Sequence, residues 1–258
     1  MSFDGCLTFI AMSLQNSTAA VAQVRGVLRP RHFMPEPRQV EIRSFRSEDR
    51  ARVRELCCET GFLGSPIDPV FSDRELFADY LTAYYTDWEP ESAFVLCIDG
   101  DIRGYLLGSR HSLRQQIHGL YQNFSLLLRG LVRYPRYDAA SRRFVQWILR
   151  TAWREVPAAP RRIAHFHINL LPDARQVATT RALMDRYLKY LHDHGERAVY
   201  GQMVVFEDRR STRMFERYGF RVLNKAEITK YRELHPEPVY LCTVIKDLDE
   251  NDQLYARP

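Results

Sequence analysis

The sequence has few cysteines, and their number and spacing exclude two structural classes. There are five, an odd number, and no pair has C-x-x-C spacing. This argues against a disulfide framework and against a zinc cluster. Cys57 and Cys58 are chain neighbours that cannot easily bridge each other, so we expect two small buried side chains on a helix. A reduced, cytoplasmic setting fits this cysteine usage best.

Long apolar runs are also missing, and so are several functional motifs. No run approaches the roughly 18–20 residues of a membrane-spanning helix. The first residues carry an acid, Asp4, where a signal peptide carries Lys or Arg, which argues against secretion. The sequence contains no G-x-S-x-G motif and no P-loop. It has no helix-turn-helix signature, RNP aromatics or zinc finger either, so nucleic acid is not an expected partner.

The composition is that of a globular protein. Of the 258 residues, 45% are hydrophobic and 27% charged, which excludes disordered and collagen-like classes. The length suits one large domain with additions. We expect a flexible N-terminal extension over 1–38, a folded body over 39–247 and a polar tail over 248–258.

Positive charge is concentrated in one segment, 111–162. It holds ten Arg, no Lys and two acids, a net charge of +8, whereas the whole chain has +5. We expect a helical insert here, in two pieces broken at Tyr134-Pro135. Its arginines could face a phosphate-bearing ligand, an acidic macromolecule or anionic lipid, or they could simply be solvated on amphipathic helices.

Hydrophobic patterning predicts an α/β (α+β) fold with a mixed sheet. The two runs 93–98 and 102–107 flank Asp99-Gly100-Asp101, which is typical of a β-hairpin. Strands are expected at 40–45, 93–98, 102–107, 162–170, 198–205, 220–229 and 239–246. Helices are expected at about 47–58, 72–84, 113–133, 139–155, 176–194 and 209–218.

Three features of this order resemble the GNAT acyltransferase superfamily over roughly residues 40–246. They are the hairpin 94–107, the string Ile168-Asn-Leu-Leu-Pro172 with Arg175 and the helix that follows, and the helix-turn from Ser211 to Phe220. The string His165-Phe-His-Ile-Asn-Leu-Leu-Pro172 is most similar to the branch related to the acetyltransferase-like domain of O-GlcNAcases. The resemblance implies a largely antiparallel sheet of about seven strands flanked by helices.

The resemblance also implies acetyl-CoA as cofactor, and it places the pyrophosphate at the start of the long helix. A helix N-terminus suits an anion because its first N–H groups are unpaired. Here the loop reads Arg175-Gln-Val-Ala178-Thr-Thr180, so the two glycine positions of the family hold Ala178 and Thr180. Ala178 is tolerated if its φ is helical. Before this loop, Leu170 and Leu171 are expected to offer backbone groups to the pantetheine arm.

The implied reaction is direct attack by a primary amine of a small molecule, such as an amino sugar, with no metal. Strand alternation puts His165, His167 and Asn169 on one face, and a histidine there could be the base. The family's general-acid Tyr position is held by Phe215, and Tyr218 lies three residues on. The candidate catalytic residues are therefore His165, His167 and Tyr218.

The expected coenzyme contacts are Leu170, Leu171, Arg175, Gln176, Val177, Ala178, Thr179, Thr180, Arg181, Asp208, Ser211 and Phe215. Two rival functions remain open. One is a non-catalytic GNAT-like module that still binds acyl-CoA. The other is a basic module for an acidic macromolecule or membrane surface. The oligomeric state is open too, with a homodimer as one alternative.

Two groups of acids are weaker candidates for binding the amine. One group lies on or just after the second helix and includes two aromatic residues that could instead belong to the core: Asp73, Glu75, Asp79, Tyr84 and Tyr85. The other surrounds Trp88: Asp87, Glu89 and Glu91. For both groups the alternative is a solvated surface.

Overall fold

The computed structural model describes residues 38–206 and 213–248. The extension predicted over 1–38 and the tail predicted over 248–258 thus lie almost wholly outside the described residues. In the described part, no helix is both long and apolar enough to cross a bilayer.

Seven strands form one sheet in the order β1-β2-β3-β4-β5-β7-β6. Neighbouring strands are antiparallel except β4 and β5, which are parallel. The strands are β1 (Val40–Ser44), β2 (Ala93–Ile98), β3 (Asp101–Ser109), β4 (Ala164–Leu170), β5 (Ala198–Val205), β6 (Arg221–Glu227) and β7 (Tyr240–Asp247). The predicted fold class and the predicted strands are confirmed.

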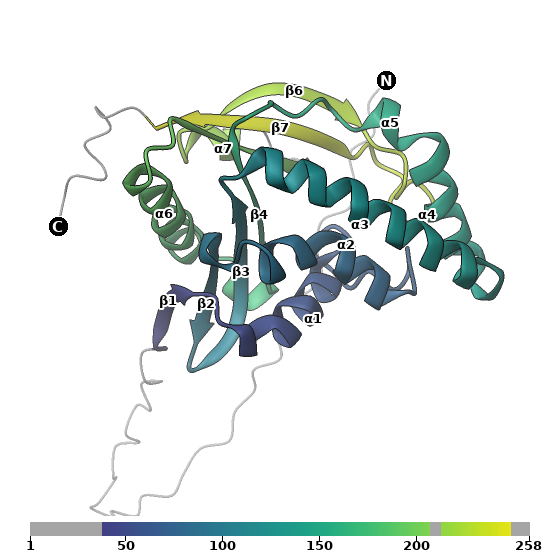
Figure 1. The fold of residues 1–258 in the computed structure, drawn as a ribbon, viewed down its shortest axis with the longest axis horizontal. Coiled ribbons are helices and arrows are strands. Elements are labelled where there is room, and N and C mark those ends of the chain that lie inside the picture. The colour runs from purple at the N-terminus through teal and green to yellow at the C-terminus, as the bar shows by residue number, and fades with distance from the viewer. Residues whose placement is uncertain (1–37, 207–212, 249–258) are drawn as a thin grey trace, which may run out of the picture. The chain divides into compact units, whose positions relative to one another are not determined.

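The described helices flank this sheet (Figure 1). Three of them follow β3 and precede β4 in the sequence. They are α1 (Arg50–Thr60), α2 (Arg74–Asp87), α3 (Ser112–Arg133), α4 (Ala139–Arg150), α5 (Ala152–Glu155), α6 (Val177–Asp193) and α7 (Arg213–Glu216). The helical insert predicted over 111–162 is therefore present as α3, α4 and α5.

The sheet has an apolar core on each face. Tyr105 and Leu107 of β3 belong to the cluster formed with α1 and α2. Leu106 of β3 and Phe166 of β4 pack with α6 on the other face. Because successive strand side chains alternate, one strand contributes to both cores. Cys57 and Cys58 are free thiols buried in α1, as their spacing predicted.

The predicted hairpin forms with its turn at Asp99 and Gly100, whose φ angles are 54° and 87°. Positive φ at both central residues is what a two-residue turn between twisted strands needs. Further along β3, Gly108 permits a close approach: a Cβ there would lie 2.3 Å from the Tyr187 ring of α6. The Tyr187 hydroxyl uses this space to donate to the His165 carbonyl at 2.8 Å.

The insert is anchored to the body at two places. At the end of α3, Arg129 and Arg133 pair with carboxylates of α2, at 2.6 Å to Asp79 and 3.0 Å to Asp73. In α5, the Glu155 carboxylate accepts from the Thr229 N–H at 2.7 Å. These arginine side chains are 34% exposed, and their guanidinium groups are engaged with carboxylates of α2. They hold the insert against α2.

Candidate active site

Strands β4 and β5 pair only at their beginnings and then separate. The paired residues run from Ala164 opposite Val199 to Phe166 opposite Gly201. From there β5 stays with β7 through Val205, and β4 stays with β3 through Leu170. Beyond Phe166, the β4 edge that faces β5 has no described strand against it. The GNAT resemblance places the pantetheine arm at this end of β4.

A cavity of about 1890 Å³ lies at this opening. Residues of β4, the first turns of α6, and β5 form part of its wall, and α2, α3 and α4 form another part. The volume exceeds the roughly 300–1,000 Å³ of a pocket for one drug-sized ligand. The cavity therefore has room for a large cofactor and a second molecule together.

His165 lies beneath the cavity rather than in its wall. Its side chain is buried, and its Nε2 is 2.8 Å from the Tyr85 hydroxyl of α2. Burial lowers the pKa of His165 to about 3, with a further contribution from His167. This ring is thus neutral and held in the core, so it is less suited to contacting an acceptor than a side chain in the cavity wall.

His167 is the histidine that reaches the cavity. Its ring contacts the Tyr85 ring edge-on, with centroids 5.4 Å apart. Loss of hydration lowers the pKa of His167 to about 4. An imidazole with this pKa is unprotonated near neutral pH but is a weak base, so it accepts a hydrogen bond readily and a proton only from a strongly acidic donor. Asn169, two residues on, also lines the cavity and donates to the Tyr105 hydroxyl at 2.7 Å.

The two lowered histidine pKa values predict acid destabilisation. Below pH 6.5 the unfolded histidines bind protons that the folded ones do not bind until about pH 3–4. Stability is therefore complete above pH 6.5 and falls as pH decreases, by about 1.4 kcal/mol per pH unit for each histidine. Denaturant titrations at pH 7, 6 and 5 should show a smaller acid loss for His165→Gln than for the wild type. Equal losses in both proteins would contradict the assignment.

The start of α6 offers its first N–H groups to the cavity. Gln176 is the N-cap residue, and its side chain makes no capping hydrogen bond. Val177, which is 69% exposed, and Thr180 line the cavity. Ala178 lies in the first turn with helical backbone, so alanine in place of the family's glycine adds no backbone strain. Thr179 is buried, and its hydroxyl donates to the Ala174 carbonyl at 2.7 Å.

Two residues that were predicted to contact the coenzyme make hydrogen bonds within the protein. The Leu171 N–H donates to the Arg103 carbonyl on the β3 side, at 2.9 Å. The Arg175 guanidinium donates to the Leu170 carbonyl at 2.8 Å and also to the Gly64 carbonyl. Arg175 thus ties the end of β4 to the loop after α1. Alternation along β4 turns the backbone groups of Ile168, which the sequence did not single out, toward the opening.

The C-terminal part of the cavity wall includes Phe215 and Tyr218. Phe215 is buried. Tyr218 is half-buried, and the Arg181 guanidinium lies over its ring, 5.7 Å from the centroid. Asp208 and Ser211, which the resemblance gave to the coenzyme, lie outside the described residues.

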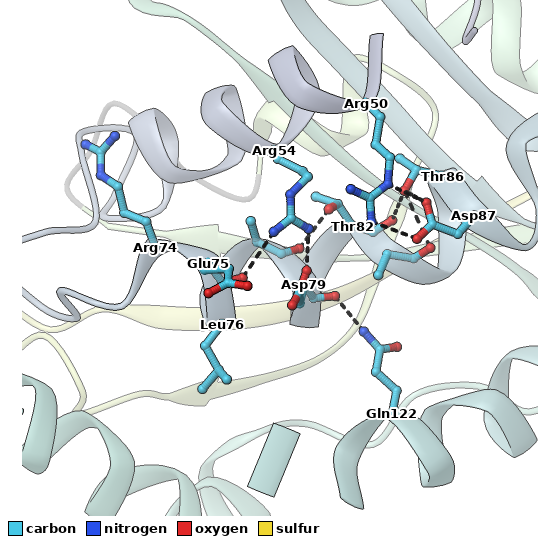
Figure 2. Close-up of polar contacts among 12 residues, drawn as sticks. Arg50, Arg54, Arg74, Glu75, Leu76, Asp79, Thr82, Thr86, Asp87 and Gln122 are labelled. Atoms are coloured by element: carbon cyan, nitrogen blue, oxygen red, sulfur yellow. Dashed lines mark hydrogen bonds and ion pairs between the residues drawn. The ribbon is translucent and has the colours of Figure 1, made fainter. Parts of the chain in front are cut away.

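The acids of α2, one of the two weaker candidate groups, are engaged in ion pairs. Asp79 pairs with Arg54 of α1, and its backbone carbonyl accepts from Gln122 of α3 (Figure 2). Glu75 pairs with Arg129 at 3.1 Å. Arginines of α1 and α3 engage these carboxylates, which disfavours an amine site here, while the Glu75 side chain remains 59% exposed.

Of the acids around Trp88, Glu89 is completely buried. Its carboxylate accepts from the Ser109 and Tyr84 hydroxyls at 2.7 and 2.8 Å. The Arg110 N–H and the Ser92 hydroxyl donate to it as well, at 2.6 and 2.8 Å. Burial alone would raise the pKa of Glu89, but these hydrogen bonds lower it below its ordinary value. Glu89 is a structural acceptor rather than part of a solvated patch.

Comparison with known proteins adds two likenesses. No protein-family model matches the sequence. The chain is similar to the solved structure of SsHAT, at 28% identity and a TM-score of 0.55, over 82% of this chain and 99% of that one. It is also similar in fold to Drosophila melanogaster polyamine N-acetyltransferase, which catalyses formation of N-acetylagmatine. That match has 14% identity and a TM-score of 0.50, over 81% of this chain and 100% of the other.

Proposed function

The chain belongs to the GNAT superfamily of acyltransferases, and we propose that it transfers an acetyl group from acetyl-CoA to a primary amine of a small molecule. One observation carries this proposal. The separation of β4 from β5 lies beside the uncapped start of α6, and a single cavity joins the two.

The residues of the cavity suit the coenzyme in charge and in hydrogen-bonding groups. The described lining residues include no Asp or Glu, and they include Arg175 and Arg181 at the start of α6 and Arg217 just after α7. The start of α6 adds the partial positive charge of a helix N-terminus, which favours a pyrophosphate. The N–H and carbonyl of Ile168 are available to an extended amide-bearing chain, as an additional strand would pair with them.

Acetyl-CoA would supply the thioester, whose C–S bond breaks as the acceptor nitrogen forms its bond to the acetyl carbon, with the thiol as leaving group. In this mechanism His167 accepts a hydrogen bond from the amine and takes the proton as the C–N bond forms, when the attacking nitrogen becomes acidic; it is neutral and lies in the cavity wall. Backbone N–H groups of β4 at the opening polarise the acetyl carbonyl. Tyr218 is the phenol in the wall that can donate a proton toward the thiolate.

Thermal unfolding with acetyl-CoA, coenzyme A and ATP tests the proposal. Ligand at about 100 times its dissociation constant stabilises a fold by roughly 2.7 kcal/mol, a rise in Tm of about 5–10 °C for a domain of this size. We expect that rise with acetyl-CoA and coenzyme A and a smaller one with ATP. No rise at millimolar acetyl-CoA would overturn the proposal.

A matched pair of variants locates the binding. Val177→Glu adds a carboxylate in the first turn of α6, where it favours the helix but repels a phosphate. We expect the unliganded Tm to be kept and the acetyl-CoA shift to be lost. Ala182→Glu adds the same charge to the same helix at an exposed position outside the cavity lining, and should keep the shift.

Phe215 favours a second candidate, a module that binds acyl-CoA without turnover. Its side chain is buried at the cavity wall and cannot donate a proton. Release of free thiol, followed with a thiol reagent over a panel of amines, separates the two candidates. An enzyme releases thiol in proportion to acceptor. A binding module shows the Tm shift alone.

A further inference from the structure

The part of the cavity wall built by the helices is apolar. Side chains of α3 and α4 in this wall remain substantially exposed, among them Leu127 at 43%, Leu131 at 57% and Leu149 at 55%. On α2, Phe77 and Leu81 line the same space. Because two of these three helices belong to the insert between β3 and β4, the insert supplies much of the apolar surface. Contacting it stabilises an apolar ligand by about 25 cal/mol for each Å² removed from water.

The same wall lacks groups that would hold a cationic acceptor. No described lining residue is Asp or Glu. The nearby acids of α2 are occupied, since Asp73 pairs with Arg133 and Asp79 with Arg54 and Arg129. A polyamine in this cavity would lose hydration at its second ammonium group without gaining a carboxylate there.

A positive charge is present instead. Lys230 lines the cavity, and its ammonium lies among the rings of Tyr231, Trp147 and Phe144, at 4.7, 5.2 and 5.7 Å from their centroids. Among the described residues no carboxylate forms an ion pair with it. Arg150 at the end of α4 lines the same cavity. These two cations are complementary to an anionic group on a ligand whose body rests on the apolar wall.

We propose that the acceptor is a primary amine on an apolar body that carries an acidic group at its other end, with Lys230 binding that acid. The apolar part contacts the wall formed by α2, α3 and α4. Polyamines and similar dications are excluded. This inference rests on the proposed acetyl transfer and names its substrate class. It also favours such an acceptor over an amino sugar, whose hydroxyls need more polar partners than this wall provides.

Four linear amines test the inference, because they share one reacting group and differ elsewhere: butylamine, octylamine, 8-aminooctanoate and 1,8-diaminooctane. Steady-state thiol release with acetyl-CoA gives kcat/KM for each. We expect octylamine to exceed butylamine by on the order of a hundredfold, from four more buried methylenes. 8-Aminooctanoate should exceed octylamine by about three- to tenfold, and 1,8-diaminooctane should fall below octylamine by a similar factor.

Two variants assign the effect to residues. Lys230→Met removes the charge, and the ratio of 8-aminooctanoate to octylamine should fall to about one. Lys225→Met is the control, because Lys225 also lies over an aromatic ring, that of Tyr240, but outside the cavity lining. It should keep the wild-type ratio. Leu131→Glu adds a carboxylate to an exposed position of the apolar wall and should raise the rate with 1,8-diaminooctane.

The outcomes are separable. A wild-type preference for 1,8-diaminooctane, or equal rates for the four amines, overturns the acceptor class while acetyl transfer stands. Turnover of glucosamine with none of the four overturns it as well. If no amine reacts and acetyl-CoA leaves Tm unchanged, the proposed function fails, and the acceptor class fails with it. The ranking of the four amines by the wild-type protein decides the acceptor class alone, so the test stays valid even if a variant does not fold.

Discussion

Replacing Glu89 with alanine is expected to lower the free energy of unfolding by about 3–5 kcal/mol, a large part of the roughly 5–15 kcal/mol that holds a domain together. The reason is the set of donors that would be left behind. Hydroxyls of Tyr84, Ser92 and Ser109 and the N–H of Arg110 all donate to this one buried carboxylate. Without it, several buried donors lose their acceptor.

Chemical denaturation at pH 7 measures this loss of unfolding free energy, and two further variants serve as comparisons. Glu91→Ala removes an exposed carboxylate two residues away and should change stability by less than about 0.5 kcal/mol. Glu89→Gln keeps the shape and one acceptor oxygen, so its loss should lie between the two. If Glu89→Ala were as stable as Glu91→Ala, the four hydrogen bonds would contribute nothing to folding.

The strands and helices could be predicted because their signals are local. Alternation along 93–98 and 102–107, with Asp99-Gly100 between them, is sufficient to specify a hairpin. The long helix was predicted at about 176–194, and α6 runs from Val177 to Asp193. Both patterns depend on residues within a few positions of each other. That is why the order of the elements and the fold class could be predicted.

Burial and pairing could not be predicted in the same way. Glu89 lies in a polar, acidic stretch and Asp79 among apolar and aromatic residues, yet Glu89 is the buried one, and nothing nearby in the sequence marks Asp79 as bound to α1 and α3. Their partners, such as Ser109 and Arg129, lie 20 and 50 residues away. Likewise, alternation puts His165 and His167 on one face, but the depth of each depends on where Tyr85 of α2 packs.

The packing partners of whole helices in the insert could not be predicted either. Its ten arginines suggested a phosphate-bearing ligand, an acidic partner or solvent. Arg129 and Arg133 instead balance the acids of α2, because α3 packs against α2 along the same side. For these two arginines the charge serves to attach the insert, whereas Arg150 of the same insert lines the cavity. The apolar residues on the same helix carry the functional information.

Replacing His167 with alanine is expected to reduce kcat/KM for acetyl transfer by about 10²-fold, the lower end of the contribution of a positioned base, because a pKa of about 4 makes the imidazole a weak base. Loss of the imidazole leaves the amine proton without the neutral acceptor that lines the cavity. His111→Ala is the control, because that side chain is exposed and makes no capping hydrogen bond to α3. It should keep the wild-type rate. The acetyl-CoA Tm shift should survive both substitutions, since α6 is untouched.

The pH dependence separates a buried base from an ordinary surface histidine. With a pKa of about 4, His167 is already neutral at every pH above 5, so the profile should have no break near 6.5. The rate should rise with pH only as the acceptor amine loses its own proton. A wild-type break near 6.5 that disappears in His167→Ala would mean that the imidazole is hydrated during turnover. A wild-type rate in His167→Ala would mean that water removes the proton and that His167 is not the base.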